Sequence, residues 1–579
     1  MDVSNFMDLN HAPRVVFNAL PERQTRVRFM IPDGQGDWRA ITWGAFAQEI
    51  KEIGLFMAGV GLKSGERATI LGHNCVAWMS AALGIQAVGG VMVPIYPSST
   101  AEQIAYVVEH SDARVLFVDS QELLIRILQR WDELSGNLLK IVALDDELDL
   151  AQTLAALRER GLPVPPVADV TAKFVRWGDA RALGRALDEQ SPDRFEQLMD
   201  SVSLDQDSVM LYTSGTTGLP KGVPLTHRNV AANGRDWLQC NAPLLEEGYV
   251  DLLWLPLSHI FGFGEVCLGN TLGFVTYWTD PRHVLDLLPK VRPEVFMSVP
   301  RMFEKLAMSA MAVEGSKAQR AKLDEITGGN FRFCLSGGAG LKPQVKEFLF
   351  SHDMLIIEGY GLTEASPTLT LNRPDAFRFD SVGKPLPSVE LKLAEDGEIL
   401  AKGPNIFSGY HKNAAATEDS FTVDGWLKTG DIGRWTDDGF LQIIDRKKEI
   451  LVTAGGKNIP PANIEVRFRD DPYLAHVVAY GDGKPFISAG IWLHPEAIEA
   501  YLEKNEISGD EESAAAIQKL IQERIDRANQ QLPRHETIRK FVILDEALTV
   551  ENGLLTATLK VKRKKVNERF RDDFEGMYS

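Results

Sequence analysis

The residues from Tyr212 to Val223, YTSGTTGLPKGV, combine side chains and backbone freedom suited to binding phosphate. Three glycines let the main chain approach an anion closely, and four hydroxyl residues with nearby amide groups can donate hydrogen bonds to it. Lys221 adds a positive point charge. A Walker A loop has Gly directly before its Lys, whereas Pro220 stands there in this chain. The segment therefore predicts a phosphate-binding site of another kind. The alternative interpretation is a surface loop of small residues without a binding role.

Further motifs follow this loop in a fixed order. They are LPLSHIFGFG (255–264), SGGAGL (336–341), YGLTEAS (360–366), WLKTGDIG (426–433), DRKKEILVTAGGKNIPPANIE (445–465) and ENGLLTATLKVKR (551–563). Together with the loop, they resemble the adenylate-forming enzymes, which include acyl-CoA synthetases, luciferases and the adenylation domains of peptide synthetases. GGKNIPPANIE and ENGLLTATLK resemble the long-chain fatty acyl-CoA synthetase branch most.

The resemblance implies a two-step reaction. A carboxylate attacks the α-phosphate of ATP to give an acyl-adenylate and pyrophosphate, and CoA then takes the acyl group and releases AMP. The first transition state is crowded with negative charge, so the protein must position the reactants and stabilise charge. Mg²⁺ is the expected metal cofactor, and the expected partners are the small molecules ATP, CoA and a carboxylic acid, for which the resemblance implies a long-chain fatty acid.

Carried over position by position, the resemblance implies the site residues of the first step. His259 would lie near the carboxylate at the mouth of the acyl tunnel, Lys560 would reach the α-phosphate from a C-terminal domain, and Glu364 would hold Mg²⁺ as a hard oxygen ligand. The residues implied to bind ATP or AMP are Thr213, Ser214, Gly215, Thr216, Thr217, Gly218, Lys221, Gly338, Gly359, Tyr360, Gly361, Thr363, Asp431 and Arg446.

For the second step, the resemblance implies that the C-terminal domain rotates about Lys448. Gly455, Gly456 and Lys457 would then line the passage for the pantetheine arm of CoA, because glycine permits close backbone approach. Two departures from the branch are small: Ala557 stands where Pro is usual, and Glu449 replaces a more frequent Asp.

Each residue also has an ordinary structural reading. Asp431 could simply begin a turn and have no role in binding. Glu364 could simply be an acidic residue in the first turn of a helix, where it complements the helix dipole. His259, expected on an apolar strand, could be a core histidine. Lys560 belongs to a basic run, and such a run is usually a solvated surface. We expect that surface for its neighbours Lys562, Arg563, Lys564 and Lys565, and contact with CoA phosphates or anionic lipid is their other option.

Composition narrows the class of protein. The chain has 579 residues with 44% hydrophobic side chains, and its net charge of −18 makes general nucleic-acid binding unfavourable. Four separated cysteines give no disulfide or zinc pattern and indicate buried thiols in a reducing compartment. Met1–Leu9 lacks a signal pattern, and the apolar stretch Ala81–Tyr96 is broken and shorter than the roughly 20 residues of a membrane helix. We expect a cytoplasmic protein, with peripheral membrane contact as an option.

The motifs require a scaffold that places them together. Strand-length apolar runs at 68–71, 114–118, 209–212, 295–299 and 331–335 alternate with helical patterns such as 100–110 and 121–133. This alternation predicts an α/β fold with parallel-rich sheets flanked by helices. After residue 381, Asp-Gly turns indicate a small antiparallel subdomain, while 164–201 is polar and mostly helical.

Two domains follow from these patterns. We expect an N-terminal adenylation domain with the acyl and ATP sites at residues 1–447, and a small mobile α+β C-terminal domain with the catalytic lysine at residues 448–579. Within the family, an acyl-AMP ligase that loads a carrier protein is a second possibility, and a luciferase-like oxygenase is a weaker one. A non-catalytic acyl- or nucleotide-binding scaffold is the alternative from another class.

Overall fold

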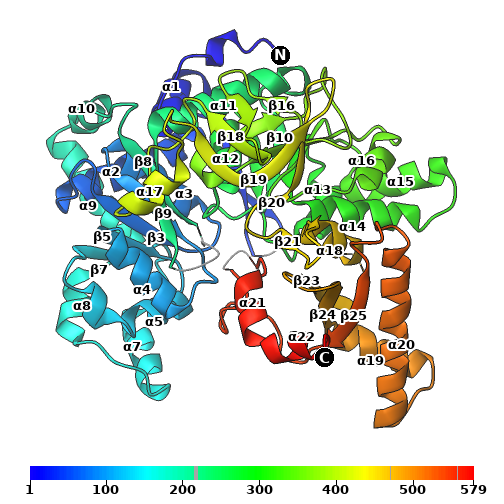
Figure 1. Ribbon diagram of the computed structural model, residues 1–579. Coiled ribbons are helices and arrows are strands. Elements are labelled where there is room, and N and C mark those ends of the chain that lie inside the picture. The colour runs from blue at the N-terminus through cyan, green and yellow to red at the C-terminus, as the bar shows by residue number, and fades with distance from the viewer. Residues whose placement is uncertain (35, 214–218, 470, 557–558) are drawn as a thin grey trace.

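The computed structural model describes residues 1–34, 36–213, 219–469, 471–556 and 559–579 (Figure 1). The expected phosphate-loop residues Ser214, Gly215, Thr216, Thr217 and Gly218 lie outside the described residues, and so does Ala557.

A seven-stranded sheet forms the first half of the N-terminal domain, in the order β7-β6-β5-β3-β4-β8-β9. Its pairs are parallel except β8 with β9. Alternate residues of β5 belong to different apolar clusters, because the sheet is covered on both faces. The strands are β3 (Arg67–Leu71), β4 (Val91–Ile95), β5 (Ala113–Val118), β6 (Lys140–Ala143), β7 (Phe174–Arg176), β8 (Asp207–Thr213) and β9 (Lys221–Thr226).

Helices cover both faces of this sheet (Figure 1). Residues of α2, α3 and α9 pack in one apolar cluster, and residues of α4, α5, α6 and α7 pack in the other. The helices of this half are α1 (Ala12–Arg23), α2 (Trp43–Gly59), α3 (Val76–Ala87), α4 (Ala101–His110), α5 (Gln121–Leu128), α6 (Trp131–Leu134), α7 (Leu150–Glu159), α8 (Val167–Lys173), α9 (Trp177–Gln190) and α10 (Arg194–Asp200).

A nine-stranded mixed sheet forms the second half, in the order β16-β15-β14-β13-β12-β10-β11-β1-β2. The strands from β14 to β1 in this order are parallel, and antiparallel strands close both edges. The strands are β1 (Val27–Pro32), β2 (Trp38–Thr42), β10 (Val250–Leu253), β11 (Val275–Trp278), β12 (Val295–Ser298), β13 (Phe333–Ser336), β14 (Ile356–Gly361), β15 (Thr368–Leu371) and β16 (Lys384–Pro385).

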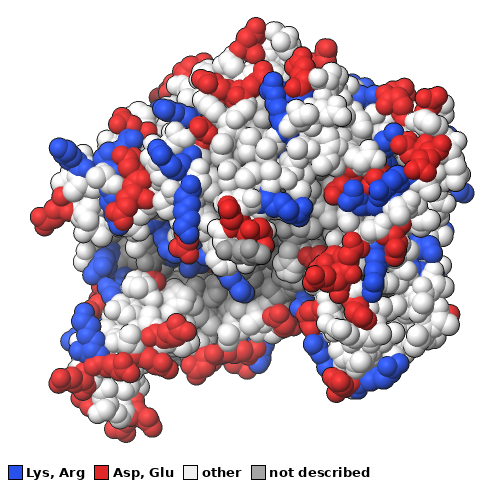
Figure 2. Space-filling view, turned by 180° about the vertical axis from the view of Figure 1, so that it is seen from behind, with Lys and Arg blue, Asp and Glu red and all other residues white. Residues whose placement is uncertain are grey.

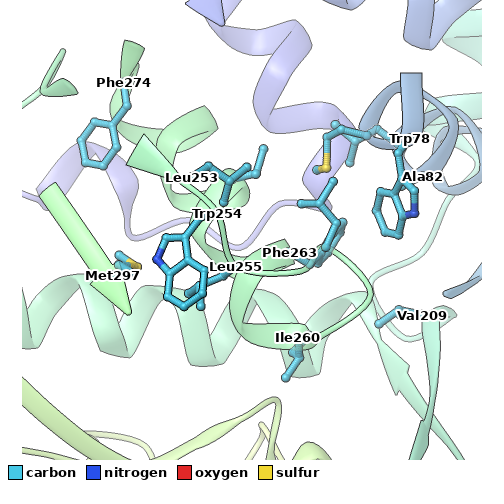
Figure 3. Close-up of a cluster of buried hydrophobic side chains, with 14 of the residues drawn as sticks. Trp78, Ala82, Val209, Leu253, Trp254, Leu255, Ile260, Phe263, Phe274 and Met297 are labelled. Atoms are coloured by element: carbon cyan, nitrogen blue, oxygen red, sulfur yellow. The ribbon is translucent and has the colours of Figure 1, made fainter. Parts of the chain in front are cut away.

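One apolar cluster runs between the two large sheets. It includes Trp78 of α3, Val209 of β8 and Phe263 of α12, together with Leu253 from the end of β10 (Figure 3). This shared core fixes the ends of the two sheets relative to each other. The helices of this half are α11 (His227–Asn241), α12 (Ile260–Leu272), α13 (Val284–Val291), α14 (Pro300–Met311), α15 (Ser316–Thr327) and α16 (Pro343–Phe350).

The predicted antiparallel subdomain is present as a four-stranded sheet in the order β17-β18-β19-β20. Its strands pair antiparallel throughout. The elements are β17 (Glu390–Leu393), β18 (Glu398–Lys402), α17 (Ala414–Ser420), β19 (Leu427–Trp435) and β20 (Leu441–Arg446).

A small α+β C-terminal domain completes the fold, coloured orange to red in Figure 1. It has its own two apolar clusters, which include Ile464, Phe468, Trp492 and Phe574. Its elements are β21 (Leu451–Val452), β22 (Asn458–Ile459), α18 (Pro461–Glu465), β23 (Leu474–Tyr480), β24 (Ile487–Leu493), α19 (Pro495–Lys504), α20 (Asp510–Asn529), β25 (Ile538–Ile543), α21 (Arg563–Arg569) and α22 (Arg571–Gly576). The predicted α/β class with a large N-terminal and a small C-terminal domain is confirmed.

Several local predictions need correction. The pattern at 121–133 forms two helices, because the chain turns at Gln129 and Arg130 and buries Trp131 beside α4. The segment 164–201 also contains a short strand, β7, which pairs with β6. Its helix α9 lies so close to α2 that a Cβ on Gly184 would meet the Glu52 carbonyl oxygen at 1.8 Å. All four cysteines are free; Cys240 and Cys334 are buried, whereas Cys75 and Cys267 are partly exposed.

The distribution of charge on the surface agrees with the prediction that the protein does not bind nucleic acid in general. On the face seen in Figure 2, acidic side chains are widespread and basic side chains lie among them rather than in one continuous field. No helix in the described ranges is both long and apolar enough to cross a membrane. The stretch Ala81–Tyr96 instead supplies the end of α3 and all of β4.

Candidate active site

A cavity of about 3020 Å³ lies where the carboxyl ends of β12, β13 and β14 face the C-terminal domain. Ligands of open α/β sheets bind at such strand ends. The predicted residues that line the cavity are Thr213, Lys221, His259, Gly338, Gly359, Tyr360, Gly361, Thr363, Glu364, Asp431, Arg446, Lys448 and Lys560.

Asp431 and Arg446 meet because β19 and β20 place them opposite each other. Arg446 Nε lies 2.9 Å from Asp431 Oδ1, and the Tyr360 hydroxyl donates to Asp431 Oδ2 at 2.6 Å. Burial raises the pKa of Asp431 while the Arg446 charge opposes that shift. Burial, with the Asp431 charge, raises the pKa of Tyr360 well above its usual range. Tyr360 therefore stays a neutral donor, and the carboxylate is held in a fixed orientation at the cavity wall.

Glu364 and Lys221 are linked by Tyr410, which the sequence did not single out. The Tyr410 hydroxyl donates to Glu364 Oε1 at 2.8 Å, and Lys221 Nζ lies 4.6 Å from the centre of the Tyr410 ring. Tyr410 thus contacts both the acidic and the basic side chain, the first through its hydroxyl and the second through its ring. Tyr410 had no sequence signal, since it lies 46 positions from Glu364.

The segment from Thr363 to Thr368 is fixed by amide side chains from other elements. Asn405 Nδ2 donates to the carbonyl oxygens of Ala365 at 2.8 Å and Thr368 at 3.0 Å. Asn233 Nδ2 donates to Thr368 at 2.7 Å. These three bonds satisfy carbonyl oxygens at the end of the 3-10 helix η3 (Thr363–Ala365) and just after it, and so help to hold Thr363 and Glu364 at the cavity.

His259 is not on a strand as expected, but is the N-cap of α12. Its Nδ1 accepts a hydrogen bond from the Phe261 amide at 3.1 Å. Burial, together with the Lys560 charge, lowers the pKa of His259 to about 4. The imidazole is therefore neutral at pH 7, and because Nδ1 is the acceptor, we assign the proton to Nε2. It can donate one hydrogen bond to a carboxylate.

Lys560 crosses from the C-terminal domain into the cavity. Its Nζ donates to the Gly338 carbonyl oxygen at 3.3 Å, 222 positions away in the chain. Burial and the Arg446 charge lower the pKa of Lys560, while Asp431 opposes them. The basic run around it is not uniformly solvated: the Arg563 side chain is only 13% exposed and forms a bidentate pair with Glu465. The prediction of a solvated side chain is therefore wrong for Arg563, because Glu465 holds it.

A buried ion pair that the sequence did not reveal supports the SGGAGL segment. Lys346 and Glu358 are each 3% exposed and contact directly, and Glu358 Oε1 also accepts from the Leu341 amide at 2.7 Å. Burial raises the pKa of Glu358 despite the nearby Lys346. The pair therefore fixes the loop whose Gly338 carbonyl receives Lys560.

The residues expected to serve CoA lie elsewhere. Gly455, Gly456 and Lys457 form the hairpin between β21 and β22 and are not among the described residues that line the cavity. Lys448 is exposed in the turn after β20. Its neighbour Lys447 is anchored to Asp396 at 2.5 Å and Glu398 at 2.7 Å. Among the described residues, the structure thus brings together those expected to serve adenylation and leaves those expected to serve CoA apart from them.

Comparison with known proteins identifies the family. Residues 17–411 match the family described as AMP-binding enzyme, and residues 448–579 match the AMP-binding enzyme C-terminal domain. The chain therefore belongs to the AMP-binding enzyme family.

Named relatives and solved structures agree with this assignment. Long-chain-fatty-acid--CoA ligase FadD15 of Mycobacterium bovis is 34% identical, with 94% of this chain and 93% of the relative covered. Long-chain-fatty-acid--CoA ligase ACSBG2 of Xenopus laevis is 28% identical, with 94% and 80% covered. These matches confirm the resemblance to adenylate-forming enzymes of the long-chain acyl-CoA synthetase branch.

Two solved structures share the fold at lower identity. The adenylation domain of a carboxylate reductase from Mycobacterium chelonae has a TM-score of 0.80 at 21% identity, covering 98% of this chain and 91% of that chain. The anthranilate CoA ligase AuaEII, solved with anthranoyl-AMP, has a TM-score of 0.76 at 21% identity, covering 99% and 100%. Both extend over nearly the whole chain, so the two-domain fold is common to all three.

Proposed function

We propose that this protein activates a long-chain fatty acid with ATP and transfers the acyl group to CoA, as an AMP-forming acid–thiol ligase. The relatives that carry this name match nearly the whole chain. One observation supports the proposal most: Lys560 of the C-terminal domain lies in the same cavity as Thr213, Lys221 and Glu364 of the N-terminal domain.

In the first step, a carboxylate oxygen bonds to the α-phosphorus of ATP as the bond to the β-phosphate bridge breaks, and pyrophosphate leaves with that electron pair. His259 Nε2–H orients the carboxylate, while Lys560 and Thr363 stabilise charge on the α-phosphate. Lys221 and the hydroxyl-rich segment 213–218 bind the β- and γ-phosphates. Fixed donors and cations lower the barrier because they need no reorganisation as charge develops.

The nucleoside part is bound beside this centre. Asp431, already oriented by Tyr360 and Arg446, accepts hydrogen bonds from the ribose hydroxyls. Gly359, Tyr360 and Gly361 form the wall of the adenine slot. A Cβ on Gly361 would meet the Pro367 carbonyl oxygen at 1.8 Å, so the slot depends on glycine there.

Glu364 would hold Mg²⁺. Mg²⁺ usually binds one or two protein carboxylates together with phosphate oxygens and waters, so a single carboxylate beside the phosphates suits it. Among the described residues, no three or more His, Cys, Asp or Glu side chains form a metal-binding group. Glu364 meets this need because Tyr410 fixes its carboxylate at the cavity wall. When bound, the ion neutralises phosphate charge.

In the second step, the CoA sulfur bonds to the acyl carbonyl carbon, the bond from that carbon to the AMP oxygen breaks with its electron pair leaving on AMP, and the thiol proton passes to solvent. We propose that residues 448–579 turn about Lys448 relative to residues 1–447, which withdraws Lys560 and brings Gly455, Gly456 and Lys457 to the acyl group. Their position outside the present cavity supports this two-conformation scheme.

The test separates the steps. Exchange of labelled pyrophosphate into ATP with palmitate and Mg²⁺ should be rapid, and AMP formation should require CoA. A series of acids from two to about twenty carbons should show preference for long chains. Transfer to a phosphopantetheine carrier but not to CoA would favour the carrier-loading alternative, and absence of exchange with every acid would favour the scaffold.

A further inference from the structure

Two basic side chains of the C-terminal domain end on the same loop of the N-terminal domain. Lys560 Nζ donates to the Gly338 carbonyl oxygen at 3.3 Å, and Arg469 Nη1 donates to the Gly340 carbonyl oxygen at 3.0 Å. The two residues come from separate segments, since Lys560 precedes α21 and Arg469 follows the 3-10 helix Val466–Phe468. They therefore contact the loop from two separate segments of the C-terminal domain.

The Gly338–Leu341 loop is itself held in place, so the two contacts can position the C-terminal domain relative to the N-terminal domain. Its backbone turns at Gly338, where φ is +84° and favours glycine. At its far end, the Leu341 amide donates to Glu358, which is held by the buried Lys346. A loop attached to a buried ion pair offers its carbonyl oxygens at defined places.

Arg469 is exposed, but it directly follows a packed segment of the C-terminal domain. The preceding residue, Phe468, is 3% exposed and belongs to the apolar cluster of the C-terminal domain together with Ile464. The Asp445 carboxylate accepts from the Ala462 amide of α18 at 3.1 Å and supports the same region from the N-terminal side of Lys448. Arg469 thus connects two well-packed bodies by one charge-assisted hydrogen bond.

We propose that Arg469 is a positioning residue that holds the C-terminal domain on the Gly338–Leu341 loop and so places Lys560 for the first half-reaction. It touches no reacting atom. The inference rests on the proposed function, because it assigns Arg469 to one of its two conformations. Its contact must break when the domain turns for the second half-reaction.

The expected effect is selective. If the two domain arrangements are close in free energy, loss of one exposed hydrogen bond changes their ratio by roughly 2- to 10-fold. Arg469→Ala should therefore slow pyrophosphate exchange by about that factor. Thioester formation from preformed palmitoyl-AMP and CoA should be unchanged or faster, since it needs the released arrangement. Arg469→Lys should recover much of the exchange rate, because a single carbonyl oxygen does not require the bidentate guanidinium.

The matched control is Arg467, which lies two positions earlier, is exposed, and bonds to Gln531 within the same domain at 3.3 Å. Arg467→Ala should leave the ratio of the two half-reactions as in the wild type. Equal loss of both half-reactions in Arg469→Ala, or no loss of exchange, would overturn the positioning role. Failure of the wild type itself to catalyse exchange would count against the proposed function instead.

Discussion

The Tyr410 hydroxyl donates a 2.8 Å hydrogen bond to Oε1 of Glu364, while the Tyr410 ring faces Lys221. One aromatic side chain thus orients the expected metal ligand and the expected phosphate-binding cation. The burial of Tyr410 and the Glu364 charge raise the pKa of its hydroxyl, so it remains a donor throughout the physiological range. Its contribution can be measured separately from that of either partner.

Tyr410→Phe removes the hydroxyl and keeps the ring. We expect pyrophosphate exchange to fall about 10-fold, the scale of one hydrogen bond to a charged group, and the Mg²⁺ concentration for half-maximal rate to rise. The measurement is exchange rate against Mg²⁺ concentration. Tyr501→Phe, on α19 away from the cavity, is the control. An unchanged Mg²⁺ dependence in Tyr410→Phe would contradict the orienting role.

Lys560→Ala should reduce adenylation by two or more orders of magnitude, since it deletes a cation from a transition state rich in negative charge. Thioester formation from preformed acyl-AMP should remain near the wild-type rate. Lys565→Ala, at an exposed member of the same basic run that is not among the residues lining the cavity, should affect neither step. Equal loss of both steps in Lys560→Ala would refute its assignment to the first step.

Gly456→Leu should spare pyrophosphate exchange and block CoA ester formation, because a bulky side chain would fill the proposed pantetheine passage. Gly456 has φ of +71° with open space where a Cβ would stand, so some backbone strain is unavoidable although nothing clashes. Gly483→Leu carries matching strain, with φ of +68° and open space, in the same domain. If both variants lose CoA ester formation alike, strain rather than the passage explains the result.

Lys346→Met should destabilise the protein by about 3 kcal/mol or more, because it leaves the Glu358 carboxylate buried without its counter-charge. The double variant Lys346→Met with Glu358→Gln should recover part of that loss, since the amide still accepts from Leu341 and carries no charge. Urea unfolding of the four proteins measures the coupling. Strictly additive losses would show that the two side chains do not act as a pair.

Stability should fall on mild acidification, in part through His227. Burial and the neighbouring His11 lower the pKa of His227 from 6.5 to about 3. The unfolded chain therefore binds a proton at His227 below about pH 6.5, whereas the folded chain does not bind it until about pH 3. The contribution of His227 to the free energy of unfolding is thus fully present above pH 6.5 and is lost as the pH falls. At pH 5 the loss is on the order of 2 kcal/mol. Urea unfolding at pH 7 and 5 should show a smaller difference in His227→Gln, and an identical difference would contradict the assignment.

Much of the fold and site could be predicted from local sequence. Parallel strands such as β5 are continuous apolar runs because both faces are covered, and the motif residues Asp431 and Arg446 meet by strand pairing. What sequence could not reveal were contacts between distant positions. Tyr410 and Lys346 carry no motif, and the environment of Arg563 depends on Glu465, 98 positions away.

His259 shows a second reason why prediction from the sequence was incomplete. Its apolar neighbours indicated a strand, but the chain enters α12 there and the imidazole caps the helix. Short apolar runs fit either element, and only tertiary packing decides between them. The cytoplasmic location and peripheral membrane contact stay predictions.

The turn at Lys448 has anchored residues on both sides. Lys447 is tied by two ion pairs to the antiparallel sheet, and Glu449 lies 3.6 Å from Arg563 of the C-terminal domain. The turn at Lys448 therefore stands directly between a residue held by the antiparallel sheet and a residue close to the C-terminal domain's Arg563. Under the proposed scheme, the change from the first half-reaction to the second is a reorientation at this turn, and the side chains of residues 1–447 that line the cavity keep their places.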